Sequence, residues 1–357
     1  MSSQTFNVAV IGYGMSAKVF HIPLILATPA FKLHAIVQRS PKPDDDAEKD
    51  HAGVKGYRSA EEMVKNSAVD VVVVTTTPES HFYLAKLALE AGKNVIVEKP
   101  FTPTHQEAQE LSALAKKNHR LLTVYQNRRW DSDFVTLSHL IKSNTLGRVA
   151  EFETHFDRHR PEVPSGGSWK TKVMPGGGAV FDLGTHLIDQ VVVTFGLPKK
   201  ITGFVGSQRE GDTGGFEDSC TVLLHYDQLM ATVKAAVVSP EVAQLRYWVR
   251  GDKGSFKKFH LDVQEDQLKA GMKPGDAGFA IESEDHFGTL TTIQDGKPVS
   301  KVFPTAHPPT YVEFYQRFAD ALRGKGEVPV KPEEAGAVIR LIELAKESSK
   351  TGRTLDV

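Results

Sequence analysis

The sequence contains a single cysteine, Cys220, among its 357 residues. One cysteine excludes an intramolecular disulfide and a zinc site built from cysteine thiolates, so nothing in the chain requires an oxidising compartment. Long hydrophobic runs are also missing: no window approaches the ~20 apolar residues of a membrane span, and the run Val8 to Ile11 is far too short for the core of a signal peptide. We therefore expect a cytoplasmic protein with no membrane partner.

An excess of charge of either sign is missing too. The 43 lysines and arginines nearly balance 44 aspartates and glutamates, for a formal net charge of −1. Nucleic-acid-binding proteins carry a surplus of basic residues, and this composition has none, so we expect small-molecule ligands and no nucleic-acid partner. A chain of this length exceeds what one hydrophobic core usually organises, which predicts two domains.

The first 125 residues alternate short β-branched runs with segments of helical periodicity. The runs read FNVAVIG, KLHAIVQ, VDVVVVTTT, NVIVEKP and LLTVYQN. Strands that are apolar on both faces and separated by helices are typical of a parallel sheet covered on both sides. Thr104 is the expected N-cap of one helix, and Gly92 the expected stop of another. We predict that residues 1–125 form a doubly wound Rossmann domain of the α/β class.

Residues 126–357 follow a different pattern. Alternating runs such as KKITGFVG, DSCTVLLHY, LMATVKAAVV and QLRYWVRG predict strands, and Asp295-Gly296 predicts the turn of a hairpin. Two helices are expected near the C-terminus, at about 309–323 and 332–350. We predict an α+β domain over 126–357 with a large, mostly antiparallel open sheet, whose terminal helix can pack back on the first domain.

A glycine motif, Gly12-x-Gly14-x-x-Ala17, follows the first predicted strand and opens a helix. The first glycine permits a tight turn, the second lets the backbone approach a pyrophosphate, and the small third residue allows close helix packing. A helix N-terminus at this turn would face the phosphates, with Met15 and Ser16 beside them. We predict a dinucleotide site here; the alternative is a glycine turn without a ligand.

The next strand ends in Gln38-Arg39-Ser40. An NAD site usually has an acidic residue at this place, which binds the ribose hydroxyls and repels a 2′-phosphate. Arg39 can instead stack on the adenine and pair with a phosphate, and Ser40 can donate a hydrogen bond to it. We predict NADP(H) rather than NAD(H); the alternative is that Arg39 is only a surface cation.

Ligands of doubly wound sheets bind at the carboxyl ends of the strands. A lysine that lies there, partly desolvated beside the nicotinamide, has a lowered pKa and can exchange a proton with a hydroxyl group, which is the role we predict for Lys99. The adjacent Glu98 can orient Lys99, touch the cofactor or anchor the loop; the alternative for this charged pair is a surface salt bridge. The further residues predicted to line the cofactor at these strand ends are Thr75, Thr76, Thr77, Pro78, His81, Glu98, Lys99, Pro100, Asn127 and Arg128.

A second constellation is the segment PGGGAVFDLGTHLIDQ. Asp182, His186 and Asp189 are spaced so that on a single helix they would share one face. A carboxylate beside a histidine fixes its tautomer and raises its basicity, which suits proton transfer to or from an alcohol. The same spacing also occurs when an aspartate caps a helix and a histidine is merely packed. A nicotinamide cofactor handles the hydride and leaves the proton to the protein, which favours the functional interpretation.

The chain contains, in this order, Gly12-x-Gly14-x-x-Ala17, Glu98-Lys99-Pro100 and Asp182-x-x-x-His186. With these three motifs it resembles the glucose-fructose oxidoreductase/inositol dehydrogenase/rhizopine-catabolism (Gfo/Idh/MocA) family. The resemblance implies oxidation or reduction of hydroxyl groups on sugars, inositols and related polyols with NAD(P), by a homodimer or homotetramer formed through the C-terminal sheet. It also implies that Lys99, Asp182 and His186 are the catalytic residues. The segments GYGMSAKVFHIPLI, NRRWDSDF and DLGTHLIDQ are similar to the NADP-dependent scyllo-inositol dehydrogenase branch. That branch usually has Trp-Arg where this chain has Trp169-Lys170. The resemblance implies a cofactor contact for Trp169, whereas the departure from arginine means that no charge role is carried over to Lys170.

The segment HFDRHRP places His155, Asp157 and His159 on one side of a strand, a spacing that superficially suggests a metal. No further ligand cluster supports one, so we predict no metal site. We expect Arg158 and His159 to approach the substrate together with Lys99, Asp182 and His186; the alternative for the two basic residues is a polar sheet edge. A non-catalytic, NAD(P)-binding regulator of the same fold is the alternative function.

Overall fold

The computed structural model describes residues 4–163, 172–211, 213–306 and 310–357. The chain forms two compact units, each assembled from three segments. Unit 1 comprises Met1–Asn127, Gln264–Phe279 and Pro309–Gly336, and unit 2 comprises Arg128–Val263, Ala280–Pro308 and Ala337–Val357. The assignment of cofactor binding to 1–125 and of substrate binding to 126–357 stays a prediction.

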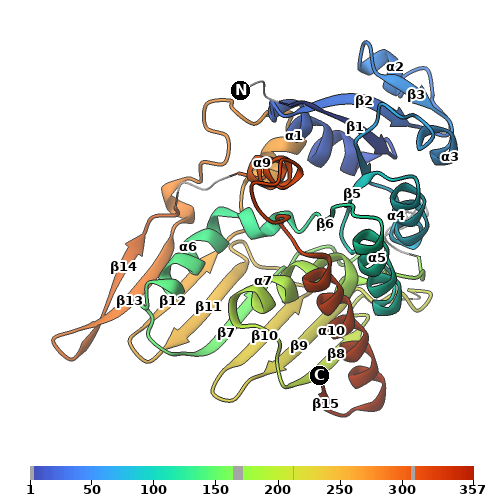
Figure 1. The fold of residues 1–357 in the computed structure, drawn as a ribbon. Coiled ribbons are helices and arrows are strands. Elements are labelled where there is room, and N and C mark those ends of the chain that lie inside the picture. Colours follow the sequence, from blue (N-terminus) through green and yellow to red (C-terminus); the bar gives the residue numbers. More distant parts are fainter. Residues whose placement is uncertain (1–3, 164–171, 212, 307–309) are drawn as a thin grey trace. The chain divides into compact units, whose positions relative to one another are not determined.

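Unit 1 is built on a six-stranded parallel sheet with the order β3-β2-β1-β4-β5-β6 (Figure 1). The strand order reverses between β1 and β4, as it does in doubly wound folds. β1, β4 and β5 are buried on both faces, which explains their unbroken apolar sequences. The strands are β1 Phe6–Ile11, β2 Phe31–Val37, β3 Lys55–Tyr57, β4 Val71–Val74, β5 Asn94–Val97 and β6 Leu122–Val124.

The helices of unit 1 confirm both predicted helix ends. The Thr104 side chain accepts from the amide of Glu107, and the Glu107 carboxylate accepts from the amide of Thr104, which together form a capping box. Gly92 has φ +75° just after the other helix, where glycine is favoured. The helical segments are η1 Ser16–His21, α1 Ile22–Ala27, α2 Ala47–Asp50, α3 Ala60–Met63, η2 Pro78–Ser80, α4 His81–Glu90, α5 His105–Lys117, α8 Gln264–Lys269 and α9 Val312–Leu322.

Unit 2 is built on a nine-stranded sheet with the order β14-β13-β12-β11-β7-β10-β9-β8-β15. β7 and β10 pair in parallel and the other pairs are antiparallel, which confirms the predicted mostly antiparallel sheet. β13 and β14 form the predicted hairpin, with Asp295 and Gly296 both at positive φ. The strands are β7 Val149–His155, β8 Lys200–Gly206, β9 Ser219–His225, β10 Met230–Ala235, β11 Leu245–Gly251, β12 Gly254–Phe259, β13 Gly288–Gln294, β14 Lys297–Phe303 and β15 Leu355–Asp356.

Helices cover one face of this second sheet (Figure 1). They are α6 Ser132–Lys142, α7 Thr185–Phe195, which follows the π-helix η5 Val180–Gly184, and the later part of α10 Pro332–Thr351. The opposite face carries the alternate residues of the strands, among them the exposed side chains of Phe204, Met230 and Trp248. No helix among the described residues is long and apolar enough to cross a membrane.

Candidate active site

The glycine turn lies at the carboxyl edge of the unit 1 sheet. Hydrogen bonds from Gly12 to Val37, from Thr75 to Ile11 and from Glu98 to Val74 continue the strand ladder into three neighbouring loops. They bring the predicted residues Gly12, Thr75 and Glu98 together at one edge. The strand order therefore places the loops after β1, β4 and β5 side by side, as the sequence predicted.

The two glycines meet the requirements of a phosphate cradle. Gly12 has φ +103°, and a Cβ at this position would lie 2.9 Å from Thr75 Oγ1. Gly14 opens onto free space, since a Cβ there would have no atom within 4 Å among the described residues. Ala17 is fully buried, as the small third residue of the motif should be. These residues fit the pyrophosphate of a dinucleotide. The chain then enters the π-helix η1 and not a regular α-helix, which the motif did not predict.

The loop after β2 is held in place by its neighbours. The buried Gln38 side chain donates to Asp45 O (2.7 Å) and accepts from the amide of Ala47 (2.9 Å). Lys18 pairs with Asp45 at 2.5 Å. Arg39 and Ser40 are exposed on this loop, and the Arg39 guanidinium makes no hydrogen bond or ion pair with any residue that the structure describes. Arg39 is therefore available to an anionic ligand.

Glu98 is buried at 7% exposure and bonded on both carboxylate oxygens. Oε1 accepts from Ser16 Oγ (2.6 Å) and lies 3.0 Å from His21 Nε2, and Oε2 accepts from the amide of Lys99 (2.8 Å). Burial alone would raise the pKa of Glu98, but the His21 hydrogen bond, the Lys99 charge and the Ser16 hydroxyl lower it below its usual value. Glu98 thus anchors the loop to the glycine turn and holds the backbone of the half-buried Lys99.

His81 joins two of the loops at the same edge. Its Nδ1 lies 2.8 Å from Pro100 O and its Nε2 lies 3.1 Å from Thr76 O. Burial lowers the pKa of His81, while the two carbonyl groups favour protonation and oppose this shift. Both ring nitrogens face backbone carbonyls, so His81 positions the Thr75–Pro78 segment and the Lys99-Pro100 turn.

Asp182 and His186 lie in unit 2, on two successive helical segments. Asp182 is half-buried within the π-helix η5, and His186, at 5% exposure, is the second residue of α7. η5 runs directly into α7, so the predicted helix is present with a π-helical first part, and the shared face of Asp182, His186 and Asp189 stays a prediction. Asp189, on the same helix as His186, accepts two hydrogen bonds of 2.7 Å from Arg129. Lys99 belongs to unit 1, so its meeting with Asp182 and His186 in one site stays a prediction.

A buried polar network in unit 2 was not predicted. The fully buried Arg246 donates to Asp133 (2.8 Å), to Thr154 (3.0 Å) and to Gln190 on α7 (3.0 Å). A β-bulge between Leu245 and Tyr247 turns Arg246 away from the open face and into this core. The only signal of this network in the sequence was the position of Arg246 inside the largely apolar run QLRYWVRG.

Two arginines predicted to contact cofactor or substrate stack on one aromatic ring. The guanidinium carbons of Arg128 and Arg158 each lie 4.7 Å from the centroid of Phe156. Arg128 also pairs with the buried Asp131 at 3.1 Å, and burial raises the pKa of Asp131 well above its usual value.

The neighbouring histidines have protein partners. His155 lies 2.9 Å from Asp157 and 3.4 Å from Glu153, and His159 pairs through its backbone with Val238. Among the described residues no group of three or more His, Cys, Asp or Glu side chains is arranged to hold a metal. Trp169 lies outside the described residues, so its predicted cofactor contact stays a prediction.

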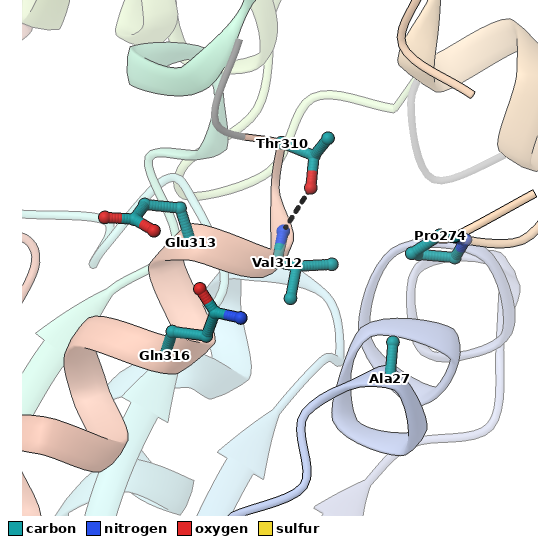
Figure 2. Close-up of a pocket in the computed structure, with 7 residues that line it drawn as sticks. Ala27, Pro274, Thr310, Val312, Glu313 and Gln316 are labelled. Carbon is teal, nitrogen blue, oxygen red and sulfur yellow. Dashed lines mark hydrogen bonds between the residues drawn. The ribbon is translucent and has the colours of Figure 1, made fainter. Parts of the chain in front are cut away.

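One pocket of unit 1, of about 260 Å³, lies apart from the predicted residues (Figure 2). Its lining includes Ala27, Pro274, Val312, Glu313 and Gln316. Glu313 bonds Arg317 at 2.8 Å. None of the lining residues belongs to the glycine turn, the Glu98 loop or the Arg39 loop.

Two family models match nearly the whole chain. The NAD-binding Rossmann fold of the GFO_IDH_MocA oxidoreductase family matches residues 6–126, and the C-terminal alpha/beta domain of that family matches residues 138–357. The chain belongs to the Gfo/Idh/MocA family. It is thus an oxidoreductase with an NAD-binding Rossmann domain, as the resemblance in the sequence implied.

Several Gfo/Idh/MocA relatives are similar along their whole length. The oxidoreductase YdgJ of Escherichia coli is 40% identical over 99% of both chains. The scyllo-inositol 2-dehydrogenase (NADP(+)) IolW of Bacillus subtilis is 34% identical over 98% of this chain and 96% of its own. The solved structure of the oxidoreductase yvaA from Bacillus subtilis has a TM-score of 0.94 at 34% identity, and covers 100% of this chain and 99% of its own.

Proposed function

We propose that the protein is an NADP(H)-dependent oxidoreductase that interconverts a hydroxyl and a carbonyl group on a sugar, an inositol or a related polyol. The observation that carries the proposal is the arrangement around Glu98. One buried carboxylate ties Ser16 of the glycine turn to the backbone of Lys99, so a cradle for phosphates and the residue that carries a lysine amine are held at the same edge of one sheet. This pairing suits a nicotinamide enzyme, in which the cofactor and a proton-exchanging group must be positioned together.

The preference for NADP(H) is supported by the loop after β2. Arg39 and Ser40 are exposed where an NAD site usually has a carboxylate, and the Arg39 guanidinium has no competing ion pair among the described residues. The relative IolW, whose name gives NADP(+) as its cofactor, agrees with this preference.

When bound, the nicotinamide supplies the hydride acceptor or donor, and the protein must handle the hydroxyl proton. Lys99 or His186 takes up or returns that proton, and Asp182 orients the site. Arg158 and His159 contact the substrate, while Trp169, Asn127 and Arg128 contact the cofactor. These roles require Lys99 and the Asp182/His186 pair to meet in the assembled enzyme.

We also propose that the enzyme is a cytoplasmic homodimer or homotetramer formed through the open face of the unit 2 sheet. Phe204 is 62% exposed on this face, and Trp248 is 38% exposed there. Large apolar side chains gathered on one sheet face mark a protein interface. Sedimentation velocity checks the proposal, and a monomer at micromolar concentration would contradict it.

The experiment that tests the function is a screen of sugars, cyclitols and their keto forms for a change in NADPH absorbance. We expect turnover with at least one polyol or its keto form, and a lower rate with NADH than with NADPH. Tight NADPH binding without turnover of any compound would contradict an enzymatic role and would favour the non-catalytic regulator.

A further inference from the structure

Behind the Glu98 loop, a row of buried polar groups runs through unit 1. The Tyr315 hydroxyl on α9 lies 2.6 Å from His21 Nδ1, and His21 Nε2 lies 3.0 Å from Glu98 Oε1. Tyr315 and His21 are fully buried. The ring of His21 also contacts Tyr125, with the ring centroids 4.4 Å apart. Burying a polar group costs free energy unless the group is hydrogen-bonded, so the pairing of all three side chains indicates a specific polar network in the core.

Either ring nitrogen of His21 can donate or accept, and we assign the hydrogen bonds of the row as running from Tyr315 through His21 to Glu98. Burial and the nearby Glu98 raise the pKa of Tyr315 well above its usual value, so its hydroxyl keeps the proton and donates to His21 Nδ1. His21 Nε2 then carries a proton and donates to Glu98, which also accepts from Ser16 and from the amide of Lys99. In this assignment every donor has an acceptor.

We propose that Tyr315 and His21 are positioning residues that hold the Glu98 carboxylate in one orientation and, through it, fix the Ser16 turn and the Lys99 backbone. Both residues are fully buried, so we expect them to act on the site through Glu98. The segment that carries α9 lies nearly two hundred residues after Arg128 in the chain, yet it would set the geometry of the cofactor site. The link to cofactor binding rests on the proposed function, whereas the row itself does not.

A double-mutant cycle tests whether Tyr315 acts through Glu98. We expect Tyr315→Phe to weaken NADPH binding by about five- to tenfold, as titration by fluorescence measures it. In the Glu98→Gln background the same substitution should change the affinity by less than about twofold. Tyr125→Phe is the matched control, because it removes the hydroxyl of another phenol that contacts His21 and that bonds Phe20 O. It should leave the affinity unchanged, and equal effects of Tyr315→Phe in both backgrounds would overturn the proposal.

Thermal unfolding without ligand tests the row independently of function. The charged and titratable groups around Glu98 are His21, Lys99, Tyr315 and His81. Because the pKa of Glu98 is lowered in the folded state, its contribution to stability is fully present above the unfolded value of about 4.3 and is lost as the pH falls through the lower folded value. Replacing His21 with leucine removes the hydrogen bond that lowers this pKa, and burial then moves the folded value toward or above the unfolded one, so this loss of stability at acid pH should shrink or reverse.

We therefore expect His21→Leu to melt below the wild type at pH 7, and its melting temperature to fall less than that of the wild type as the pH is lowered from 7 to about 3.5. This difference in pH dependence should vanish when both proteins also carry Glu98→Gln. An unchanged pH dependence in His21→Leu would overturn the row whether or not NADPH binds. A wild-type protein that binds no NADPH but shows the expected pH dependence would instead contradict the proposed function.

Discussion

Arg39 is the single residue on which the proposed cofactor preference depends most. It lies two residues after the end of β2, is exposed, and has no ion-pair partner among the described residues. A guanidinium group can bond a 2′-phosphate with two parallel hydrogen bonds, which a ribose hydroxyl cannot replace. The selectivity for NADPH should therefore disappear with the side chain, while the rest of the cofactor site remains.

We expect Arg39→Ala to weaken NADPH binding about tenfold or more and to leave NADH binding within about twofold. Calorimetric titration of both cofactors measures the two changes. Lys32→Ala is the matched control, since Lys32 is an exposed cation at the other end of β2 and should affect neither affinity. Equal affinity of the wild type for NADPH and NADH would contradict the role of Arg39.

Glu98 shows what the sequence could and could not predict about one residue. Its place at the end of a buried strand, before Lys99-Pro100, was enough to assign it to the site edge. Two of its partners, Ser16 and His21, were not predictable, because they lie about eighty residues away in the chain. Only the packed structure shows that both carboxylate oxygens are committed to hydrogen bonds.

At the scale of elements, strand β8 and helix α10 pack with their backbones in close approach. A Cβ added to Gly203 on β8 would lie 2.1 Å from the carbonyl oxygen of Ala345 on α10. The Gly203 amide also donates to Ser348 on the same helix at 2.9 Å. A side chain at Gly203 would therefore push the helix away from the sheet and break this hydrogen bond.

We expect Gly203→Ala to destabilise the protein by about 1–3 kcal/mol, the usual cost of overpacking. Gly206 lies on the same strand, and a Cβ there would meet no described atom within 4 Å, so Gly206→Ala is the matched control and should change stability little. The midpoints of denaturant unfolding compare the two variants. Equal midpoints would show that α10 does not pack on β8 as described.

Elements with a clear local pattern were predicted, and those set by distant contacts were not. The capping box at Thr104 and the hairpin turn at Asp295 were predictable because each needs only neighbouring residues. The π-helices η1 and η5 were read as regular helices, since apolar spacing does not distinguish the two. Strand β12, with its mixed sequence GSFKKF, pairs between β11 and β13 and was missed.

At the scale of the whole molecule, the order of segments in the sequence does not give the composition of the two compact units. The family, the parallel sheet and the mostly antiparallel sheet were all predictable from motifs and periodicity. The membership of Gln264–Phe279 and Pro309–Gly336 in unit 1 was not, because an apolar helix face does not say which sheet it will cover. Because Pro309–Gly336 belongs to unit 1, Tyr315 on α9 lies next to His21 and forms part of the row behind Glu98.

The central claim is that the chain catalyses hydride exchange with Lys99 or His186 as the proton carrier. If so, Lys99→Met and His186→Ala should each remove most of the chemistry while the phosphate cradle and the Arg39 loop still hold the cofactor. Lys86 on α4, an exposed lysine paired with Glu110, supplies the matched control Lys86→Met, which should behave as the wild type.

The most direct measurement is turnover of the best substrate from the polyol screen by Lys99→Met, with the NADPH dissociation constant determined on the same preparation. The account predicts a fall in kcat of about 100-fold or more and an NADPH affinity within about threefold of the wild type. Full turnover by both Lys99→Met and His186→Ala would contradict it.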